Sequence, residues 1–159
     1  MLIDCHCHLQ PFDPDKLRLT MQDAQRAGVG GFLSVSQDVR TSNQTVEMCL
    51  QEDHVWAGIG IHPWHAIPID QQTRQGLMAL AEREGVVAIG EIGLDFERVT
   101  DRAAHEVQLQ AVKTQLQMAQ QLSLPVSLHC RGAHAEMLAL LNTEGAGVNG
   151  VIHSFAGNA

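Results

Sequence analysis

Five histidines and one glutamate in this chain stand where they could hold metal ions. Residues 1–8 are expected to form a short buried strand, on which His6 and His8, two residues apart, share one face. Asp4 would join them there, whereas Cys5 and Cys7 would point the other way. Two imidazoles a few ångströms apart on a rigid strand can bind one ion. By itself the pair is equally compatible with two unrelated histidines at a strand end.

The other candidates each end an apolar run that is typical of a buried strand: His62, Glu91, His129 and His153. The carboxyl ends of parallel strands carry the active site in α/β proteins. Histidine and carboxylate ligands suit zinc, manganese or a similar divalent ion that keeps positions open for water. Glu91 stands between the sets of histidines and could bridge two ions about 3.5–4 Å apart, an arrangement that serves displacements at phosphorus.

Strands and helices alternate along the chain, as the spacing of apolar residues and turn signals predicts. The expected strands cover residues 1–8, 31–36, 55–62, 86–91, 125–129 and 150–153. The expected helices run from Pro14 to about Gly28, from Thr41 or Ser42, from Asp70 to Gly85, over 103–122 and over 134–143. This alternation predicts an α/β fold of βαβ units with a parallel sheet. No linker or repeat divides residues 1–159, so a single domain is expected.

The length, net charge and cysteine content of the chain limit the functions that it can have. The 159 residues suffice for one domain with a core, and the formal charge of −8 offers no general basic surface to nucleic acid. That charge leaves a phosphoesterase possible, because a metal ion or a few arginines can bind phosphate locally. The four cysteines form no secreted-type framework, which predicts reduced thiols in a cytoplasmic protein. No signal peptide or membrane segment is expected.

Several further residues have weaker signals. Arg131 could hold a phosphate bidentately, although a solvated arginine is equally compatible with its position. Asp95 follows a glycine-containing stretch that lacks the lysine of phosphate-binding loops, so it is expected to order that loop. Trp64 is expected to pack, with stacking on a base as the alternative. Ser154 beside His153 lacks the elbow motif of a nucleophile.

Five segments together resemble the TatD-type metal-dependent deoxyribonucleases, a family of amidohydrolase-like (β/α)₈ barrels. The segments are 4–8 (DCHCH), 60–63 (GIHP), 90–95 (GEIGLD), 124–131 (LPVSLHCR) and 150–155 (GVIHSF). They occur in family order and span nearly the whole chain. The resemblance implies a parallel barrel of TIM type in which metal-activated water hydrolyses phosphodiester bonds of DNA.

The resemblance also implies roles for individual residues. The implied metal ligands are His6, His8, Glu91, His129 and His153, with Glu91 at the centre of catalysis. His62 and Arg131 would lie at the substrate phosphate. Two divalent ions, of zinc, magnesium or manganese, are the implied cofactors. Two alternatives stay open, namely a metal-dependent hydrolase of a lactone, amide or other substrate, and a metal-binding remnant without catalysis.

The chain departs from the family pattern in two respects. Gly132 stands where the family usually has aspartate after the arginine of the fifth-strand segment. A (β/α)₈ barrel needs about 200–250 residues, so about six strands and five helices of an incomplete barrel are expected. The last two strands and the family's late aspartate are not in the sequence, which makes activity of this chain uncertain. The first and sixth strands would be unpaired edges, which predicts self-association or a partner chain there.

Overall fold

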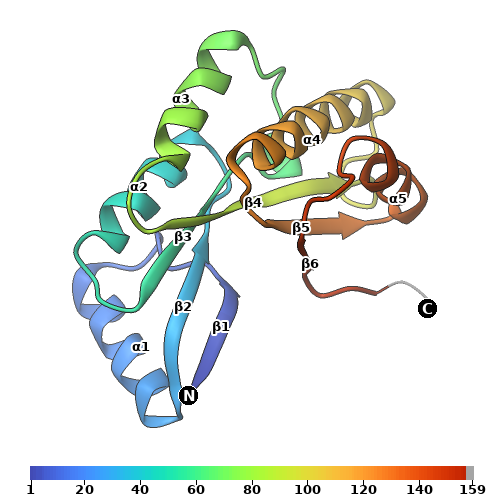
Figure 1. Ribbon diagram of the computed structural model, residues 1–159. Coiled ribbons are helices and arrows are strands. Elements are labelled where there is room, and N and C mark those ends of the chain that lie inside the picture. The colour runs from blue at the N-terminus through green and yellow to red at the C-terminus, as the bar shows by residue number, and fades with distance from the viewer. Residues whose placement is uncertain (157–159) are drawn as a thin grey trace.

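Strand and helix alternate through residues 1–156, the part of the chain that the computed structural model describes (Figure 1). The strands are β1 (Leu2–Cys7), β2 (Val29–Val35), β3 (Val55–Ile59), β4 (Val86–Asp95), β5 (Val126–Arg131) and β6 (Gly150–Ile152). The helices are α1 (Pro14–Arg26), α2 (Val39–Cys49), α3 (Gln71–Ala81), α4 (Arg102–Leu122) and α5 (His134–Thr143), with a 3₁₀ turn, η1, at Pro63–His65.

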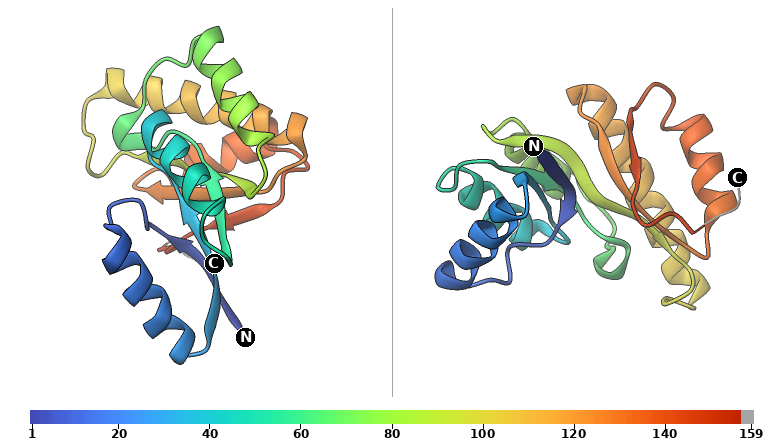
Figure 2. Two further views of the ribbon diagram at one scale, coloured as in Figure 1. Left: turned by 90° about the vertical axis from the view of Figure 1, so that its left-hand side faces the viewer. Right: turned by 90° about the horizontal axis from the view of Figure 1, so that it is seen from below.

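The six strands form one sheet in the order β1-β2-β3-β4-β5-β6, and every neighbouring pair is parallel. Each crossover passes through a helix, as parallel neighbours require. In the right-hand view of Figure 2, α1 and α2 lie at the left of the molecule and α4 and α5 at the right. The sheet is a half-barrel, which confirms the predicted α/β architecture and its incomplete set of about six strands and five helices.

Capping residues set where the helices begin. The Asp13 side chain accepts a hydrogen bond at the start of α1, and Pro14 occupies the first turn, as expected. The expected start of the second helix at 41 or 42 is wrong, because α2 already begins at Val39. Asp38 precedes it and forms a capping box, in which its carboxylate accepts from the Thr41 amide at 2.6 Å.

Three strand predictions need correction. β3 ends at Ile59 and not at residue 62, because the chain turns into η1 at Pro63, which has no amide hydrogen to continue a strand. β4 continues to Asp95, beyond the expected end at Glu91, so its carboxyl end carries a second carboxylate. The first strand is mostly exposed and not buried, because β1 lies at an edge of the sheet.

The main core lies between the sheet and the helices beside it. Ile59, Ile89, Ile92 and Leu94 from β3 and β4 are fully buried and pack in one cluster with Leu116 of α4. Burial of each such side chain stabilises the fold by about 1.5–3 kcal/mol. The strands that carry Glu91 and His129 therefore lie in the most tightly packed part of the chain, which holds their side chains in place.

Gly93 has no room for a side chain. Its φ is +154°, and a Cβ there would overlap the backbone carbonyl oxygen of His129 on the neighbouring strand. We expect Gly93→Ala to lower the free energy of unfolding by at least about 3 kcal/mol, measured by urea denaturation. The control is Gly76→Ala within α3, where nothing lies near the new methyl group and a gain of about 0.5–1 kcal/mol is expected. Equal effects of the two changes would contradict the prediction.

The two edge strands expose apolar side chains. Ile3 of β1 is 56% exposed and Val151 of β6 is 42% exposed. Because unpaired strand edges favour association, we expect sedimentation velocity to show concentration-dependent self-association. An Ile3→Lys, Val151→Lys double variant should sediment as a monomer, whereas Leu19→Lys on the surface of α1 should behave as the unaltered chain does. A monomeric unaltered chain at every concentration would contradict this expectation.

Candidate metal centre

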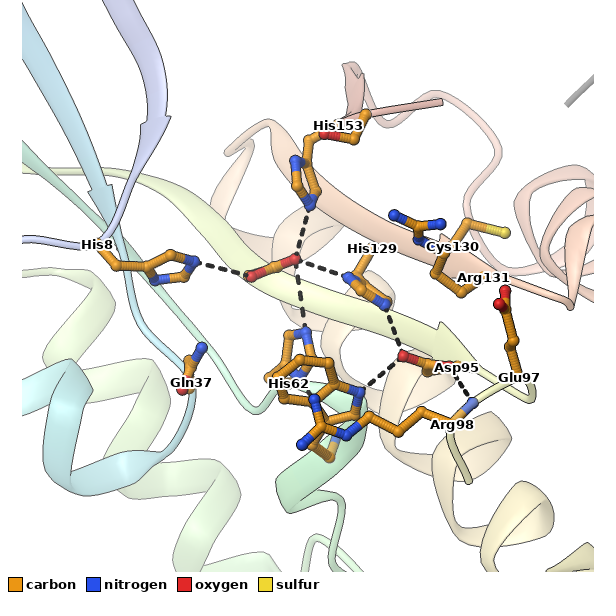
Figure 3. Close-up of a pocket in the computed structure, with 13 residues that line it drawn as sticks. His8, Gln37, His62, Asp95, Glu97, Arg98, His129, Cys130, Arg131 and His153 are labelled. Atoms are coloured by element: carbon orange, nitrogen blue, oxygen red, sulfur yellow. Dashed lines mark hydrogen bonds and ion pairs between the residues drawn. The ribbon is translucent and has the colours of Figure 1, made fainter. Parts of the chain in front are cut away.

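The carboxylate of Glu91 lies at the centre of five imidazoles, and we refer to these six residues as the Glu91 cluster. Oε1 of Glu91 is 3.0 Å from Nδ1 of His129, 3.1 Å from Nε2 of His153 and 3.5 Å from Nε2 of His62. Oε2 is 3.4 Å from Nε2 of His8 and 3.5 Å from Nε2 of His6. Figure 3 shows four of these histidines converging: His129 on β5, and His8, His62 and His153 just after β1, β3 and β6. All the histidines that the sequence singled out therefore meet at one point.

His6 carries a polar atom without a protein partner. Its Nδ1 lies 3.0 Å from the Ser127 hydroxyl, whereas Nε2 is buried and has no hydrogen-bond partner among the described residues 1–156. The His6 ring also stacks on the His153 ring, with the centroids 3.7 Å apart. A buried ring nitrogen that is left unsatisfied is costly. A metal ion on the Nε2 side would satisfy it.

His8 and His62 differ in the hydrogen bond made by Nδ1, the ring nitrogen that does not face Glu91. Nδ1 of His8 lies 3.0 Å from the Val35 carbonyl oxygen and can only donate to it, which leaves the Nε2 lone pair facing Glu91. Nδ1 of His62 instead accepts from the Trp64 amide at 3.2 Å, so neutral His62 carries its proton on Nε2. Burial lowers the pKa of His62, which favours that neutral form.

The Glu91 carboxylate is held in its charged form. Burial alone would raise its pKa, but the ring nitrogens of His129, His6, His62 and His8 that face the carboxylate outweigh burial and lower the pKa well below its usual range. The same carboxylate raises the pKa of His8, because protonated His8 can donate a hydrogen bond to it from Nε2. A buried anion encircled by imidazoles is an environment that a divalent cation would complement.

The donor atoms fit metal ions in two groups that share Glu91. His6, His8 and Glu91 offer ligand atoms within 4.8 Å of one another, and so do His62, Glu91 and His129, although the proton on Nε2 of His62 leaves that residue no free lone pair for an ion. His153 is close to both groups, because its Nε2 faces the same Glu91 oxygen as His129. Nitrogen and carboxylate donors in this number suit a site for one or two divalent ions.

Asp95 contributes to the centre more directly than the sequence indicated. Its Oδ2 is 3.0 Å from Nε2 of His129 and accepts from the Trp64 indole at 2.7 Å, while Oδ1 accepts from the Arg98 amide at 2.8 Å. Gln108 on α4 accepts from the Asp95 amide at 2.9 Å. His129 therefore has a carboxylate at each ring nitrogen, and although burial opposes it, the two carboxylates raise the pKa of His129. Asp95 sits at the end of β4, and only its pairing with β5 brings it to His129.

A pocket of about 510 Å³ opens over the cluster (Figure 3). Trp64 packs as expected against His62, with the ring centroids 4.7 Å apart, but it is also 40% exposed and borders the pocket. The Arg98 guanidinium lies over the Trp64 ring at 3.8 Å from its centroid. Arg131, from the end of β5, lines the same pocket, as its assignment near a substrate requires.

Asp4 lies outside the Glu91 cluster, whereas the cysteines are free thiols as predicted. Asp4 does not join the cluster, because the strand register is irregular between Asp4 and Cys7 and the Asp4 carboxylate accepts from the His6 amide at 3.1 Å. All four cysteines are free, as expected. Cys7 donates to the Leu33 carbonyl, and burial raises the pKa of its thiol to about 12, so it stays protonated and is no thiolate ligand.

No helix in the part of the chain that the structure describes is long and apolar enough to cross a membrane.

Comparison with known proteins agrees with this arrangement. The profile of the TatD related DNase family matches residues 3–159. The chain belongs to the TatD related DNase family. The predicted resemblance to TatD-type deoxyribonucleases is thereby confirmed.

Two curated relatives and one solved structure illustrate the TatD relationship. The uncharacterized metal-dependent hydrolase YabD of Bacillus subtilis (strain 168) is 33% identical over 162 residues, which cover 100% of this chain and 62% of YabD. The 3′-5′ ssDNA/RNA exonuclease TatD of Pantoea sp. (strain At-9b) is 43% identical over 119 residues, 74% of this chain and 45% of that protein. The TatD homologue YJJV of Escherichia coli K12 superimposes with a TM-score of 0.87 at 29% identity, over 99% of this chain and 61% of YJJV. The chain thus spans between about half and three-fifths of the length of these TatD relatives.

Proposed function

We propose that this chain acts as a divalent-metal-dependent hydrolase of phosphodiester bonds in DNA. The observation that carries the proposal is Glu91, a buried carboxylate whose two oxygens lie within 3.5 Å of five histidine nitrogens. The relatives support it, since one is named as a metal-dependent hydrolase and another as a 3′-5′ ssDNA/RNA exonuclease. The centre lies at the carboxyl ends of the strands, where barrel enzymes place their chemistry.

We assign the metal ligands as a set of five: His6, His8, Glu91, His129 and His153. Glu91 would bridge two ions, because each of its oxygens faces a different group of histidines. Imidazole ligands favour zinc or manganese, with magnesium as the less favoured third candidate. Divalent cations held there would supply Lewis-acid chemistry, which lowers the pKa of water and offsets charge on a phosphate oxygen.

His62 and Arg131 are assigned to the substrate. Because Nδ1 of His62 accepts from the Trp64 amide, its Nε2 carries the proton, and this N–H faces Oε1 of Glu91 at 3.5 Å on the wall of the pocket, where it would also reach a phosphate oxygen. Arg131 borders the pocket with an exposed guanidinium, whose planar N–H groups match a phosphate. Both residues would orient the phosphodiester group and offset its negative charge.

Metal removal and replacement test the proposal. The chain is stripped with a chelator, dialysed and assayed on bis(p-nitrophenyl) phosphate and on an end-labelled single-stranded oligonucleotide. Zinc or manganese should restore cleavage of both substrates, and the stripped chain should be inactive. Cleavage that survives removal of metal would contradict the proposal. Tight metal binding without cleavage of either ester would favour a metal-binding remnant without catalysis. Activity on a lactone or amide alone would favour a metal-dependent hydrolase of a different substrate.

We further propose that residues 1–159 form one partial barrel domain that works in the cytoplasm. The continuous six-stranded sheet of the described residues supports the single domain. The four free cysteines support a reducing compartment.

A further inference from the structure

We infer that Arg98 binds a second phosphate group of a nucleic-acid strand, next to the group that reaches the Glu91 cluster. This inference rests on the proposed function and narrows its substrate to a polynucleotide over a small phosphate ester. Neither the motifs nor the assigned ligands include Arg98, which follows β4 at the rim of the pocket.

Arg98 is held in place by two contacts. Its backbone amide donates to Oδ1 of Asp95 at 2.8 Å, and its guanidinium lies over the Trp64 ring at 3.8 Å from the centroid. Trp64 is itself anchored, because its indole donates to Oδ2 of Asp95 at 2.7 Å. One buried carboxylate therefore positions both the arginine and the ring beneath it. Because the Arg98 side chain is already ordered, less conformational entropy is lost when a ligand binds to it.

The hydrogen-bonding edge of Arg98 is free. Within residues 1–156, no ion pair and no side-chain hydrogen bond involves its guanidinium, although Glu97 borders the same pocket. By contrast, the guanidinium of Arg26 pairs with Asp23 and that of Arg83 with Glu47. Stacking on Trp64 uses the face of the guanidinium and leaves its in-plane N–H groups available. That planar fork matches the oxygens of a phosphate.

The position of Arg98 suits a second phosphate. The Glu91 cluster and Arg131 are already assigned to the reacting phosphodiester group, whereas the Arg98 guanidinium lies over the Trp64 ring in the same pocket (Figure 3). The chain has a formal charge of −8, so a polyanion needs local cations wherever it touches the surface. An unpaired arginine held beside the reaction site supplies such a charge.

Oligonucleotide binding tests this assignment without depending on catalysis. A fluorescein-labelled phosphorothioate hexathymidylate, which resists hydrolysis, is titrated in fluorescence anisotropy with the metal-loaded chain at several salt concentrations. Arg98→Gln should raise the Kd by about tenfold, as expected for loss of a charge-assisted hydrogen bond. It should also reduce the slope of log K against log salt by about 0.7, the contribution of one phosphate contact on a single strand.

Two further variants make the result specific. Arg102→Gln removes the same charge from an exposed position on α4 outside the pocket and should leave both the Kd and the salt slope unchanged. Arg98→Lys keeps the charge, so it should preserve most of the salt slope while raising the Kd a few-fold. Thermal unfolding checks that each variant is folded.

The outcomes separate this inference from the proposed function. Unchanged affinity and salt slope in Arg98→Gln, or equal losses in Arg98→Gln and Arg102→Gln, would overturn the role of Arg98 while leaving hydrolysis intact. A lower affinity with an unchanged slope would also overturn it, because the arginine would then contact a base. An unaltered chain that binds the strand through Arg98 but never cleaves a phosphodiester would overturn the proposed function alone.

Discussion

Replacing Glu91 by glutamine is expected to remove metal binding and any metal-dependent hydrolysis. Each Glu91 oxygen faces histidines, and the lowered pKa of the carboxyl keeps it charged. Glutamine has the same shape, but it is neutral and carries an N–H₂ group where one oxygen was. That group would point its hydrogens at the nitrogens that should face a cation. We expect the metal affinity to fall by at least about 100-fold, the upper end of losses near metal sites.

The effect of Glu91→Gln can be measured without catalysis. A metal at 100 times its Kd stabilises the folded chain by about 2.7 kcal/mol, so the unaltered protein should show a clear rise in Tm on adding zinc or manganese. The glutamine variant should show almost none. Glu106→Gln, an exposed position on α4, should retain the full rise. Equal stabilisation of Glu91→Gln and the unaltered chain would refute the assignment of Glu91 as a ligand.

Replacing Asp95 by asparagine is the second change with a large expected effect. Asp95 accepts at 3.0 Å from Nε2 of His129, which directs Nδ1 toward Glu91. Asparagine would face the His129 N–H either with its NH₂ group, which cannot accept a hydrogen bond, or with a neutral carbonyl oxygen, which is a weaker acceptor than a carboxylate. Because partners that orient a metal-binding histidine affect metal affinity by about 10–100-fold, we expect a loss in that range, measured by isothermal titration calorimetry.

Two controls isolate the orientation of His129. Trp64→Phe removes the other hydrogen bond to Oδ2 of Asp95 but keeps its carboxylate, so its metal affinity should change much less. The titrations are repeated at several pH values, because the raised pKa of His129 means that a proton competes with the metal and affinity should increase with pH. Asparagine relieves part of that competition, so the loss of affinity should be largest at high pH. Metal affinity that Asp95→Asn leaves unchanged across the pH range would show that Asp95 only orders its loop.

For the segment around His62, the sequence predicted the position of the residue but not its contacts. The apolar run before His62 correctly predicted a strand and placed the residue near its carboxyl end. The η1 turn determines which ring nitrogen of His62 carries the proton, because it brings the Trp64 amide to Nδ1 and leaves the proton on Nε2. Gln115 of α4 also holds this segment, by accepting from the Ile61 amide at 2.7 Å. Both contacts depend on three-dimensional proximity, and no local pattern encodes it.

The sequence by itself determined the alternating architecture and the members of the Glu91 cluster. Periodicity and turn residues act locally, and parallel strands bring their carboxyl ends to one side, so polar residues at those ends must meet. The tertiary structure alone decided the contacts made by Asp95, Trp64 and Arg98. Those residues are joined by the pairing of β4 with β5 and by the turn at Pro63. It also decided that Asp4 lies outside the cluster, because an irregular register at an edge strand overrides the two-residue alternation on which the sequence argument relied.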